Sequence, residues 1–335
     1  MKNLPDEVAA LLRLWPDYRP TPLIELPGLA KECGVGEIMA KLEADRPLGN
    51  FKSLGGMYAG LRALARAAGL PSLETLVARR GAPKLPRLIC ASDGNHGLAV
   101  AAAAEMAGAP SRIFLHKGVP PERADRIAAR GADIQWIEGT YDDAVLAASR
   151  SASAGEGLLI ADTSDDPGDP ALGDVMQGYE LIAAELAGQL AERRPTHLFV
   201  QAGVGGLAAA LVKGLADRQL LPERILVVEP KRAACVARAL ATGKPELIEG
   251  HLGTSAEMLS CGLASAPAVE ILLQYSAESL VVGEDRLAEA VVTLDRAGGQ
   301  RPRNPGRQDW RDCWRPPPVR KRGTLWVSTV RQLCF

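Results

Sequence analysis

One lysine stands between an aromatic ring and a glycine-containing turn in the stretch NFKSLGG, residues 50–56. Most lysines are solvated surface cations, and by residue type alone Lys52 would be one of them. Phe51 beside it can remove water from the amine, which lowers the pKa and frees the lone pair for attack on a carbonyl group. The Ser-Leu-Gly-Gly segment that follows suits a helix start whose free N–H groups face an anion. The stretch therefore indicates a candidate nucleophile that needs partners elsewhere in the chain.

A second polar stretch, SDGNHG at residues 92–97, follows a short apolar run and precedes an alanine-rich one. Asp93 contributes a carboxylate, and the Asn95 amide contributes both a donor and an acceptor, which can hold a ring oxygen or a carboxylate. Alternatively, Ser92 or Asp93 only caps the helix that begins here. Both interpretations place the stretch at a turn from a strand into a helix.

A third stretch, QAGVGGLAAAL at residues 201–211, has three glycines in front of an apolar helix. Because Gly203, Gly205 and Gly206 have no side chains, the backbone N–H groups there can surround a phosphate, helped by the positive end of the helix. A tight turn without a ligand is the alternative. The spacing fits neither the Walker pattern, which requires a following Gly-Lys-Ser/Thr, nor the GxGxxG pattern of dinucleotide sites.

Short apolar runs alternate with helical stretches along most of the chain. We expect strands at residues 36–43, 86–92, 111–117, 132–138, 158–162, 197–203 and 224–230. We expect helices at residues 53–69, 95–108, 120–131, 141–154, 204–218 and 235–243. This alternation predicts an α/β fold with parallel strands covered by helices on both faces. Ligands bind beyond the carboxyl ends of such strands, so the three polar stretches are expected on one edge of the sheet.

Bulk composition excludes several classes of function. A net charge of −1 gives no electrostatic reason to expect a nucleic acid or an anionic membrane as a partner. The first twenty residues contain acids and prolines rather than an apolar run, so we expect no signal peptide and a cytoplasmic protein. The six cysteines lack CxxC spacing and the four histidines are dispersed, which predicts neither disulfides nor a metal site. Cys235 and Cys261 are interpreted as packing residues.

Two further segments allow more than one interpretation. His116, Lys117 and Arg123 could bind a phosphate, but mixed charges at helical spacing favour a solvated helix face. Residues 177–179, Gln-Gly-Tyr, fall in an expected helix, where packing and active-site roles are equally well supported.

Taken in order, the three polar stretches resemble the pyridoxal-phosphate enzymes of the tryptophan-synthase-β superfamily, over about residues 20–298. The pattern is a lysine after Asn-Phe or Ser-Phe, a Ser-x-Gly-Asn-His loop and a later glycine-rich loop. TPLIELPGLA at residues 21–30 and VVEP at residues 227–230 add to the likeness. The resemblance implies pyridoxal 5′-phosphate as the cofactor, bound covalently by Lys52. The other residues that it implies for the cofactor site are Asn95, Gly203, Val204, Gly205, Gly206 and Leu207.

The same resemblance implies how the chain is divided. Two open, mostly parallel, twisted sheets with helices on both faces would form two domains, with the cofactor between them. The larger domain would comprise residues 1–60 and 151–298. The smaller domain, residues 61–150, would carry the SDGNHG loop.

Within this superfamily the likeness is closest to the diaminopropionate ammonia-lyases. The segments that carry it are SDGNHG, ADTSDD at 161–166, DVMQGYELI at 174–182, THLFVQAGVGG at 196–206 and MLSCGLASAPA at 258–268. The match implies Asp93 and Asp162 as the catalytic and substrate-binding carboxylates. An acidic residue at position 93, where dehydratases usually carry a small one, would suit a substrate with a second ammonium group.

The implied reaction is α,β-elimination of the amino acid 2,3-diaminopropionate to pyruvate and ammonia, catalysed by a homodimer. One alternative is a serine, threonine or hydroxyaspartate dehydratase of the same superfamily. Another is a catalytically impaired relic that keeps the fold, because the composition changes abruptly near the end of the chain.

Residues 298–335 contain three of the five tryptophans and eight arginines, without helical or strand periodicity. A family member would continue there with a Ser/Thr-containing segment near the cofactor's ring nitrogen and a glycine- and leucine-rich helix. Residues 308–315 are QDWRDCWR. With codons that we chose, the frame one base earlier reads Gly-Leu-Ala-Gly-Leu-Leu-Ala. We therefore infer a frameshift near residues 299–305, after which residues 299–335 would be a poorly packed, non-native tail and activity would be weakened or abolished.

DNA sequencing checks this inference directly. The frame one base earlier should encode the glycine- and leucine-rich peptide opposite residues 308–315. Tryptophan has a single codon, so the alternative leucines follow from it with little freedom. A gene in which that frame encodes another peptide would contradict the frameshift.

Overall fold

A computed structural model describes residues 6–15, 18–80, 84–92, 94–296 and 324–327. It has two sheets, and every strand pair is parallel except the pair β1–β2. The larger sheet has the order β1 (Leu23–Glu25), β2 (Ile38–Lys41), β10 (Thr324–Val327), β7 (His197–Gln201), β8 (Arg224–Pro230) and β9 (Glu278–Val282). The smaller sheet has the order β5 (Asp133–Ile137), β4 (Ser111–His116), β3 (Leu88–Ala91) and β6 (Leu158–Leu159). The predicted class, α/β with two mostly parallel sheets, is confirmed.

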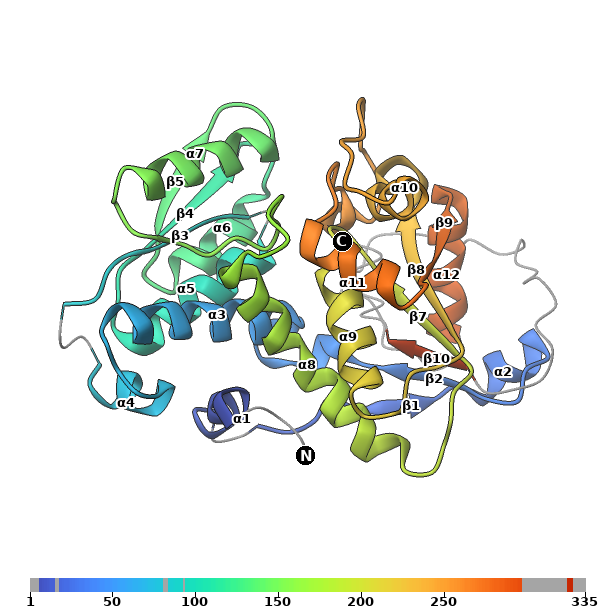
Figure 1. The fold of residues 1–335 in the computed structure, drawn as a ribbon. Coiled ribbons are helices and arrows are strands. Elements are labelled where there is room, and N and C mark those ends of the chain that lie inside the picture. The colour runs from blue at the N-terminus through green and yellow to red at the C-terminus, as the bar shows by residue number, and fades with distance from the viewer. Residues whose placement is uncertain (1–5, 16–17, 81–83, 93, 297–323, 328–335) are drawn as a thin grey trace.

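Helices cover both sheets and fill the space between them (Figure 1). The first six are α1 (Asp6–Arg13), α2 (Pro27–Cys33), α3 (Lys52–Ala67), α4 (Leu73–Ala78), α5 (Asn95–Ala107) and α6 (Pro121–Ala128). They are followed by α7 (Tyr141–Ser153), α8 (Pro170–Leu190), α9 (Gly206–Ala216), α10 (Cys235–Thr242), α11 (Ala266–Gln274) and α12 (Glu284–Arg296). Four short 3₁₀ turns are η1 (Glu43–Asp45), η2 (Pro47–Gly49), η3 (Lys231–Ala233) and η4 (Glu257–Leu259). None of the described helices combines the length and the apolar character that a membrane crossing requires.

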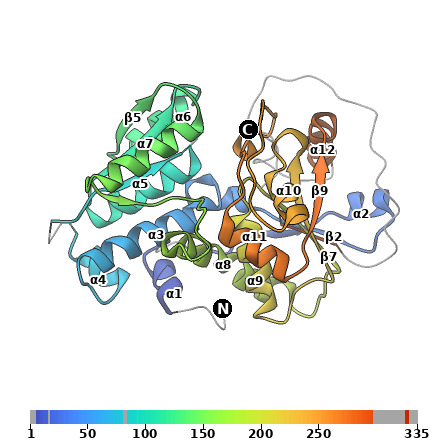
Figure 2. The same ribbon diagram turned by 45° about the horizontal axis from the view of Figure 1, so that its top comes forward.

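Figure 2 shows the smaller sheet, with α5, α6 and α7, as one lobe and the larger sheet, with α9 to α12, as the other. The described strands of the smaller sheet come from residues 88–159, and those of the larger sheet from both sides of that span. Strands β2 and β3 are buried at all four positions, as strands covered on both faces must be. The predicted domain boundaries at residues 60, 150 and 298 stay predictions.

Helices α3 and α8 cross between the lobes at a point where both backbones lack side chains. A Cβ placed on Gly178 of α8 would lie 2.7 Å from the carbonyl oxygen of Leu54 and 2.8 Å from the Cα of Gly55 in α3. Any larger residue at 178 would therefore push the two helices apart. Because α3 begins at Lys52, this contact also determines where that lysine lies relative to α8.

Strand β10 corrects one expectation about the end of the chain. Residues Thr324–Val327 pair in parallel with β2 on one side and with β7 on the other, so they occupy an interior position of the larger sheet. The prediction that this stretch contains no strand is wrong for these four residues. An interior strand position lets the backbone N–H and C=O groups pair on both sides, which a four-residue run provides even without flanking periodicity. The remainder of residues 299–335 lies outside the described residues.

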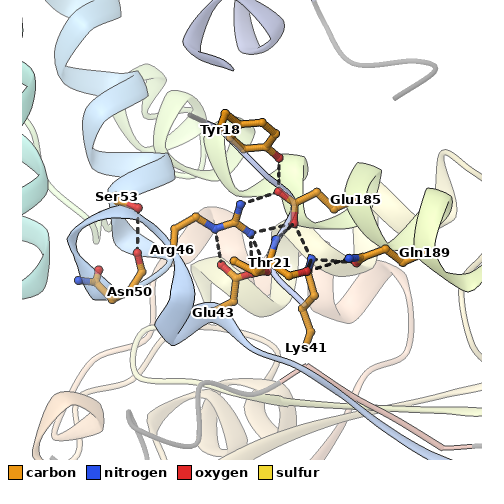
Figure 3. A network of polar contacts seen from close by, with 9 residues as sticks. All are labelled: Tyr18, Thr21, Lys41, Glu43, Arg46, Asn50, Ser53, Glu185 and Gln189. Atoms are coloured by element: carbon orange, nitrogen blue, oxygen red, sulfur yellow. Dashed lines mark hydrogen bonds and ion pairs between the residues drawn. The ribbon is translucent and has the colours of Figure 1, made fainter. Parts of the chain in front are cut away.

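A network of buried charges connects α8 to the larger sheet (Figure 3). The Glu185 carboxylate accepts hydrogen bonds from Lys41 Nζ at 2.5 Å and from Arg46 Nη1 at 2.5 Å, and none of the three side chains is exposed. Glu43 accepts a second pair of bonds from Arg46, at 2.6 and 3.0 Å. The Tyr18 hydroxyl also donates to Glu185. Two cations and two carboxylates thus neutralise one another in the core.

The contacts of Lys41 complete this network. Lys41 Nζ donates to the Thr21 carbonyl oxygen at 2.7 Å and to Gln189 Oε1 at 2.9 Å, so its three protons all have partners. Burial alone would raise the pKa of Glu185, but the hydrogen bonds and charges of Arg46 and Lys41 outweigh it and hold that pKa below its usual value. The network thereby joins three elements, namely β2, α8 and the turn that precedes Lys52.

Replacing Glu185 with Gln should destabilise the protein strongly, because Lys41 and Arg46 would lose one of their two carboxylates without leaving the core. Removing one partner of a buried pair typically costs about 3–5 kcal/mol. We expect a loss of that size in the free energy of unfolding, measured with urea at neutral pH. The exposed pair Arg13–Glu74 supplies the control, since Glu74→Gln should cost no more than about 1 kcal/mol.

The effect of Glu185→Gln on the free energy of unfolding should also depend on pH. A carboxylate whose pKa is lowered by folding stabilises the native state above its unfolded pKa of about 4.3, and this contribution is lost as the pH falls. The difference between wild type and Glu185→Gln should therefore shrink below about pH 4. A difference that grows on acidification would contradict an ionised Glu185.

Candidate active site

One cleft lies between the two lobes and contains residues from both. Its empty volume, open solvent at the mouth included, is about 810 Å³. The lining residues come from the start of α3, the start of α5, α7, the segment after β6, α8, the turn from β7 into α9, and η4 with the loop after it. They are Phe51, Lys52, Ser92, Asn95, His96, Tyr141, Asp162, Leu172, Val175, Tyr179, Gln201–Leu207, Met258, Leu259 and Cys261.

The three polar stretches meet here, as the sequence predicts, but they do not lie on one sheet edge. Lys52 and the glycine-rich turn follow β2 and β7 of the larger sheet, whereas Asn95 follows β3 of the smaller sheet. Lys52, Asn95 and Gly206 are the first residues of α3, α5 and α9. The cleft is thus formed by the starts of three helices that belong to two sheets. The sequence predicted that the three loops meet, but it did not predict that they come from two different sheets.

Lys52 forms an ion pair with Asp162, one of the two carboxylates that the resemblance implies for catalysis and substrate binding. Burial alone would lower the pKa of Lys52, but the carboxylate of Asp162 raises it above its usual value. The expectation that Phe51 makes this amine neutral is therefore wrong for the chain as it stands, because the opposite charge outweighs the desolvation. Burial opposes ionisation of Asp162 as well, yet the charge of Lys52 and its hydrogen bond to the carboxylate lower the pKa of Asp162 to about 2. Both groups are charged at neutral pH.

Asn50 connects the lysine to the neighbouring loop, a role that sequence reasoning missed. Its side-chain oxygen accepts a hydrogen bond from the Lys52 backbone N–H at 3.1 Å, and its amide nitrogen donates to Asn95 Oδ1 at 3.2 Å. Asn50 as a whole is 3% exposed. The signal for it was its place immediately before Phe-Lys, where a short amide can bond the backbone two residues ahead.

The SDGNHG stretch combines a cap with a polar site. The Ser92 hydroxyl accepts hydrogen bonds from the N–H groups of Gly94 at 2.9 Å and Gly97 at 2.8 Å, so Ser92 caps the start of α5. His96 is buried, and its Nε2 bonds the carbonyl oxygen of Ile160 at 2.8 Å. Burial lowers the pKa of His96, which keeps the imidazole neutral with its proton on Nε2. Asp93 lies outside the described residues.

The glycine-rich turn has the properties that an anion requires. Gly205 has a φ of +96°, a conformation that other residues rarely adopt, and it directly precedes the first residue of α9. No described side chain caps α9, so its first N–H groups are free for a ligand. Cys235 Sγ donates to the Gly203 carbonyl oxygen at 3.2 Å, and Cys261 lines the cleft. The two cysteines therefore pack around the turn itself, a more specific place than sequence reasoning assigned to them.

Residues 177–179 divide between packing and the site. Gln177 accepts a hydrogen bond from the Tyr58 hydroxyl at 3.0 Å, and Gly178 allows the crossing of α3 and α8. Tyr179 lines the cleft. Tyr141, at the first position of α7, also lines it and donates to Asp162 Oδ1 at 3.4 Å. The sequence left packing and active-site roles open for residues 177–179, and it gave no signal for Tyr141.

The charged segment around residue 117 does not line the cleft. Lys117 pairs with Glu138 on the surface, and Arg123 pairs with Glu257 at 2.8 Å. This agrees with the interpretation as a solvated face. Within the described residues, no cluster of three or more histidine, cysteine, aspartate or glutamate side chains could hold a metal ion.

Comparison with known proteins decides the family. The model of the pyridoxal-phosphate dependent enzyme family matches residues 14–303. The chain belongs to this family. The match ends within residues 299–305, where the sequence predicts that the family pattern is lost.

Comparison with individual relatives shows which members of the family this pyridoxal-phosphate-dependent enzyme is similar to. Diaminopropionate ammonia-lyase of Salmonella typhimurium is 34% identical over 274 residues, covering 78% of this chain and 68% of the relative. The crystal structure of holo diaminopropionate ammonia-lyase from Escherichia coli superposes with a TM-score of 0.78 at 31% identity, covering 88% and 76% of the two chains. L-threonine dehydratase of Pasteurella multocida is 28% identical over 277 residues, covering 82% of this chain and 48% of the relative.

The residues of the cleft fit the cofactor of this pyridoxal-phosphate-dependent enzyme. The uncapped start of α9 suits the phosphate, the Lys52 amine can bind the aldehyde carbon covalently, and the Asn95 amide can contact a ring oxygen. Pyridoxal 5′-phosphate would then occupy the space between the two lobes. The individual roles of Lys52, Asn95 and residues 203–207 stay predictions.

Asp162→Asn should make Lys52 more reactive toward the cofactor. Without the carboxylate, burial lowers the pKa of Lys52, and a larger fraction of the amine is neutral at pH 7. We expect pyridoxal phosphate to label the apo-protein faster by about tenfold or more. Borohydride fixation followed by peptide mapping measures this rate and should place the label on Lys52.

Asp174→Asn is the matched control, because Asp174 is a buried carboxylate that pairs with Arg62 and Arg66 outside the cleft. It should leave the labelling rate unchanged. A label on another lysine would contradict the assignment of the whole site. An unchanged labelling rate in Asp162→Asn would contradict the inference that Asp162 raises the pKa of Lys52.

Proposed function

We propose that this chain eliminates ammonia from 2,3-diaminopropionate and, with water, releases pyruvate and a second ammonia. The observation that carries the proposal is the Asp162 carboxylate, which stays ionised in the cleft and binds the primary ammonium of Lys52. A substrate with two amino groups offers an ammonium of the same kind. When Lys52 is engaged with the cofactor, Asp162 becomes available for that group. The identity of 34% to a diaminopropionate ammonia-lyase supports the same substrate.

The cofactor and the side chains of the cleft would have different roles in this elimination. When bound, pyridoxal phosphate supplies an electron sink for the charge left on the α-carbon. Lys52, once replaced by the substrate amine, can accept the α-proton on Nζ. Asp93 is proposed as a second base, and Asp162 as the group that orients the leaving ammonium. The buried neutral His96 adds no charge to the cleft.

The competing function is a dehydratase that acts on serine, threonine or hydroxyaspartate. Its leaving group is a hydroxyl, which has no positive charge for Asp162 to bind. The threonine dehydratase relative supports it less well, since the identity is 28% and the chain spans about half of that relative's length. An impaired relic is the second alternative, because residues 299–335 depart from the family pattern.

An absorbance spectrum of the purified protein, followed by a pyruvate-release screen, separates these three functions. Cofactor absorbance with pyruvate from diaminopropionate supports the ammonia-lyase, and pyruvate or another keto acid from the hydroxy amino acids alone supports a dehydratase. Cofactor absorbance without any turnover supports the relic. We further expect a homodimer, as the family resemblance implies, and a location in the cytoplasm.

Asp93→Asn should suppress elimination while leaving the cofactor absorbance largely intact. An amide keeps the shape of the side chain but can neither accept a proton nor neutralise an ammonium. Loss of a general base typically costs about 10²–10⁴ in rate. Turnover of the two stereoisomers of diaminopropionate is the measurement, and normal rates for both would reduce Asp93 to a helix cap.

A further inference from the structure

The ring of Tyr179 fills the space between the starts of two helices. A Cβ placed on Gly55, in the first turn of α3, would lie 2.5 Å from Tyr179 Cε1 and 2.7 Å from its Cζ. On the other side, a Cβ on Gly206, the first residue of α9, would lie 4.0 Å from Cε2. The ring also packs edge-to-face on Phe51, with 5.1 Å between the ring centroids. The ring, with the hydroxyl on Cζ, therefore lies between the first turn of α3 and the first residue of α9.

This hydroxyl has no hydrogen-bond partner in the described part of the chain, although Tyr179 is only 3% exposed and lines the cleft. The phenol of a largely buried tyrosine normally has a hydrogen-bond partner, and a ligand in the cleft that Tyr179 lines can supply one. Burial raises its pKa, which the charge of Lys52 opposes and that of Asp162 supports, and the net pKa lies above the usual value. The group is a neutral donor at all moderate pH values.

An anion at the start of α9 needs such a donor. The charged side chains that line the described cleft are Lys52 and Asp162, and they neutralise each other. A phosphate at residues 203–207 would therefore be held by backbone N–H groups and the helix dipole, without a cation of its own. A phenol beside Gly206 adds a side-chain donor where these N–H groups converge.

We propose that the Tyr179 hydroxyl donates a hydrogen bond to the phosphate of the cofactor at the start of α9. Tyr179 is thus a cofactor-binding residue that acts through the phosphate and not through the reacting carbon. This role rests on the cofactor site that the proposed function uses, and it is independent of which amino acid the enzyme consumes.

The test compares deoxypyridoxine phosphate with unphosphorylated deoxypyridoxine, two ligands that lack the aldehyde and so bind without bonding to Lys52. Tyr179→Phe keeps the ring against Phe51 and Gly55 and removes only the oxygen. Because hydrogen bonds to charged groups are among the stronger ones, its affinity for the phosphorylated ligand should fall by about tenfold or more. Its affinity for the unphosphorylated ligand should stay unchanged. Calorimetric titration of the apo-protein measures both.

Tyr58→Phe is the matched control, since it removes a buried hydroxyl from the same helix pair, where Tyr58 donates to Gln177 outside the cleft. It should change neither affinity. An equal loss for both ligands in Tyr179→Phe would mean a packing effect and overturn the proposal, as would no loss for either. If wild type bound both ligands equally, the phosphate site itself would fail, and Tyr179 with it. No amino acid is used, so a failed elimination reaction would not alter this result.

Discussion

The buried carboxylate of Glu185 is the point on which the arrangement of the molecule depends. It is bound by Lys41 of β2 and by Arg46 of the segment that leads into α3, so one side chain joins the larger sheet, α8 and the approach to Lys52. Charges this deep in a core are tolerated only when each has a partner of opposite sign. The network therefore allows one position of α8 relative to β2, and a shift of either element would leave a charge unpaired.

Because Glu185 holds α8 in place, α8 in turn determines the position of the residues that it contacts in the cleft. About two turns before Glu185, Gly178 lies against α3 with no side chain between the backbones, and Tyr179 rests on Gly55. The start of α3 is thus held by contact with a helix whose other end is held by charge. This explains how a lysine on a flexible four-carbon chain acquires a defined place between Asp162 and the glycine-rich turn.

The electrostatics of the cleft follow from three helix starts and one ion pair. Starts of helices attract anions, and the Lys52–Asp162 pair adds no net charge. Such a site favours a ligand with a phosphate at one end and, near the other, an aldehyde that the Lys52 amine can bind. Under the proposed function, Asp162 would become available for a second ammonium once Lys52 is engaged with the cofactor, and this would favour a diamino acid over a hydroxy amino acid as substrate.

Local pattern determined much of this protein. Alternating apolar and helical runs predicted most strands between residues 36 and 230, and glycines or amides after those strands predicted the loops at residues 52, 95 and 203–207, because helix and strand periodicity is a property of neighbouring residues. Only the tertiary structure decided that the loops meet across two sheets and that β10 enters the larger sheet. It also decided that Asp162 reverses the pKa shift of Lys52, and that Tyr179 rather than Gln177 lines the cleft. Each of these depends on the field or the space created by residues more than a hundred positions away. No periodicity within a segment records that information.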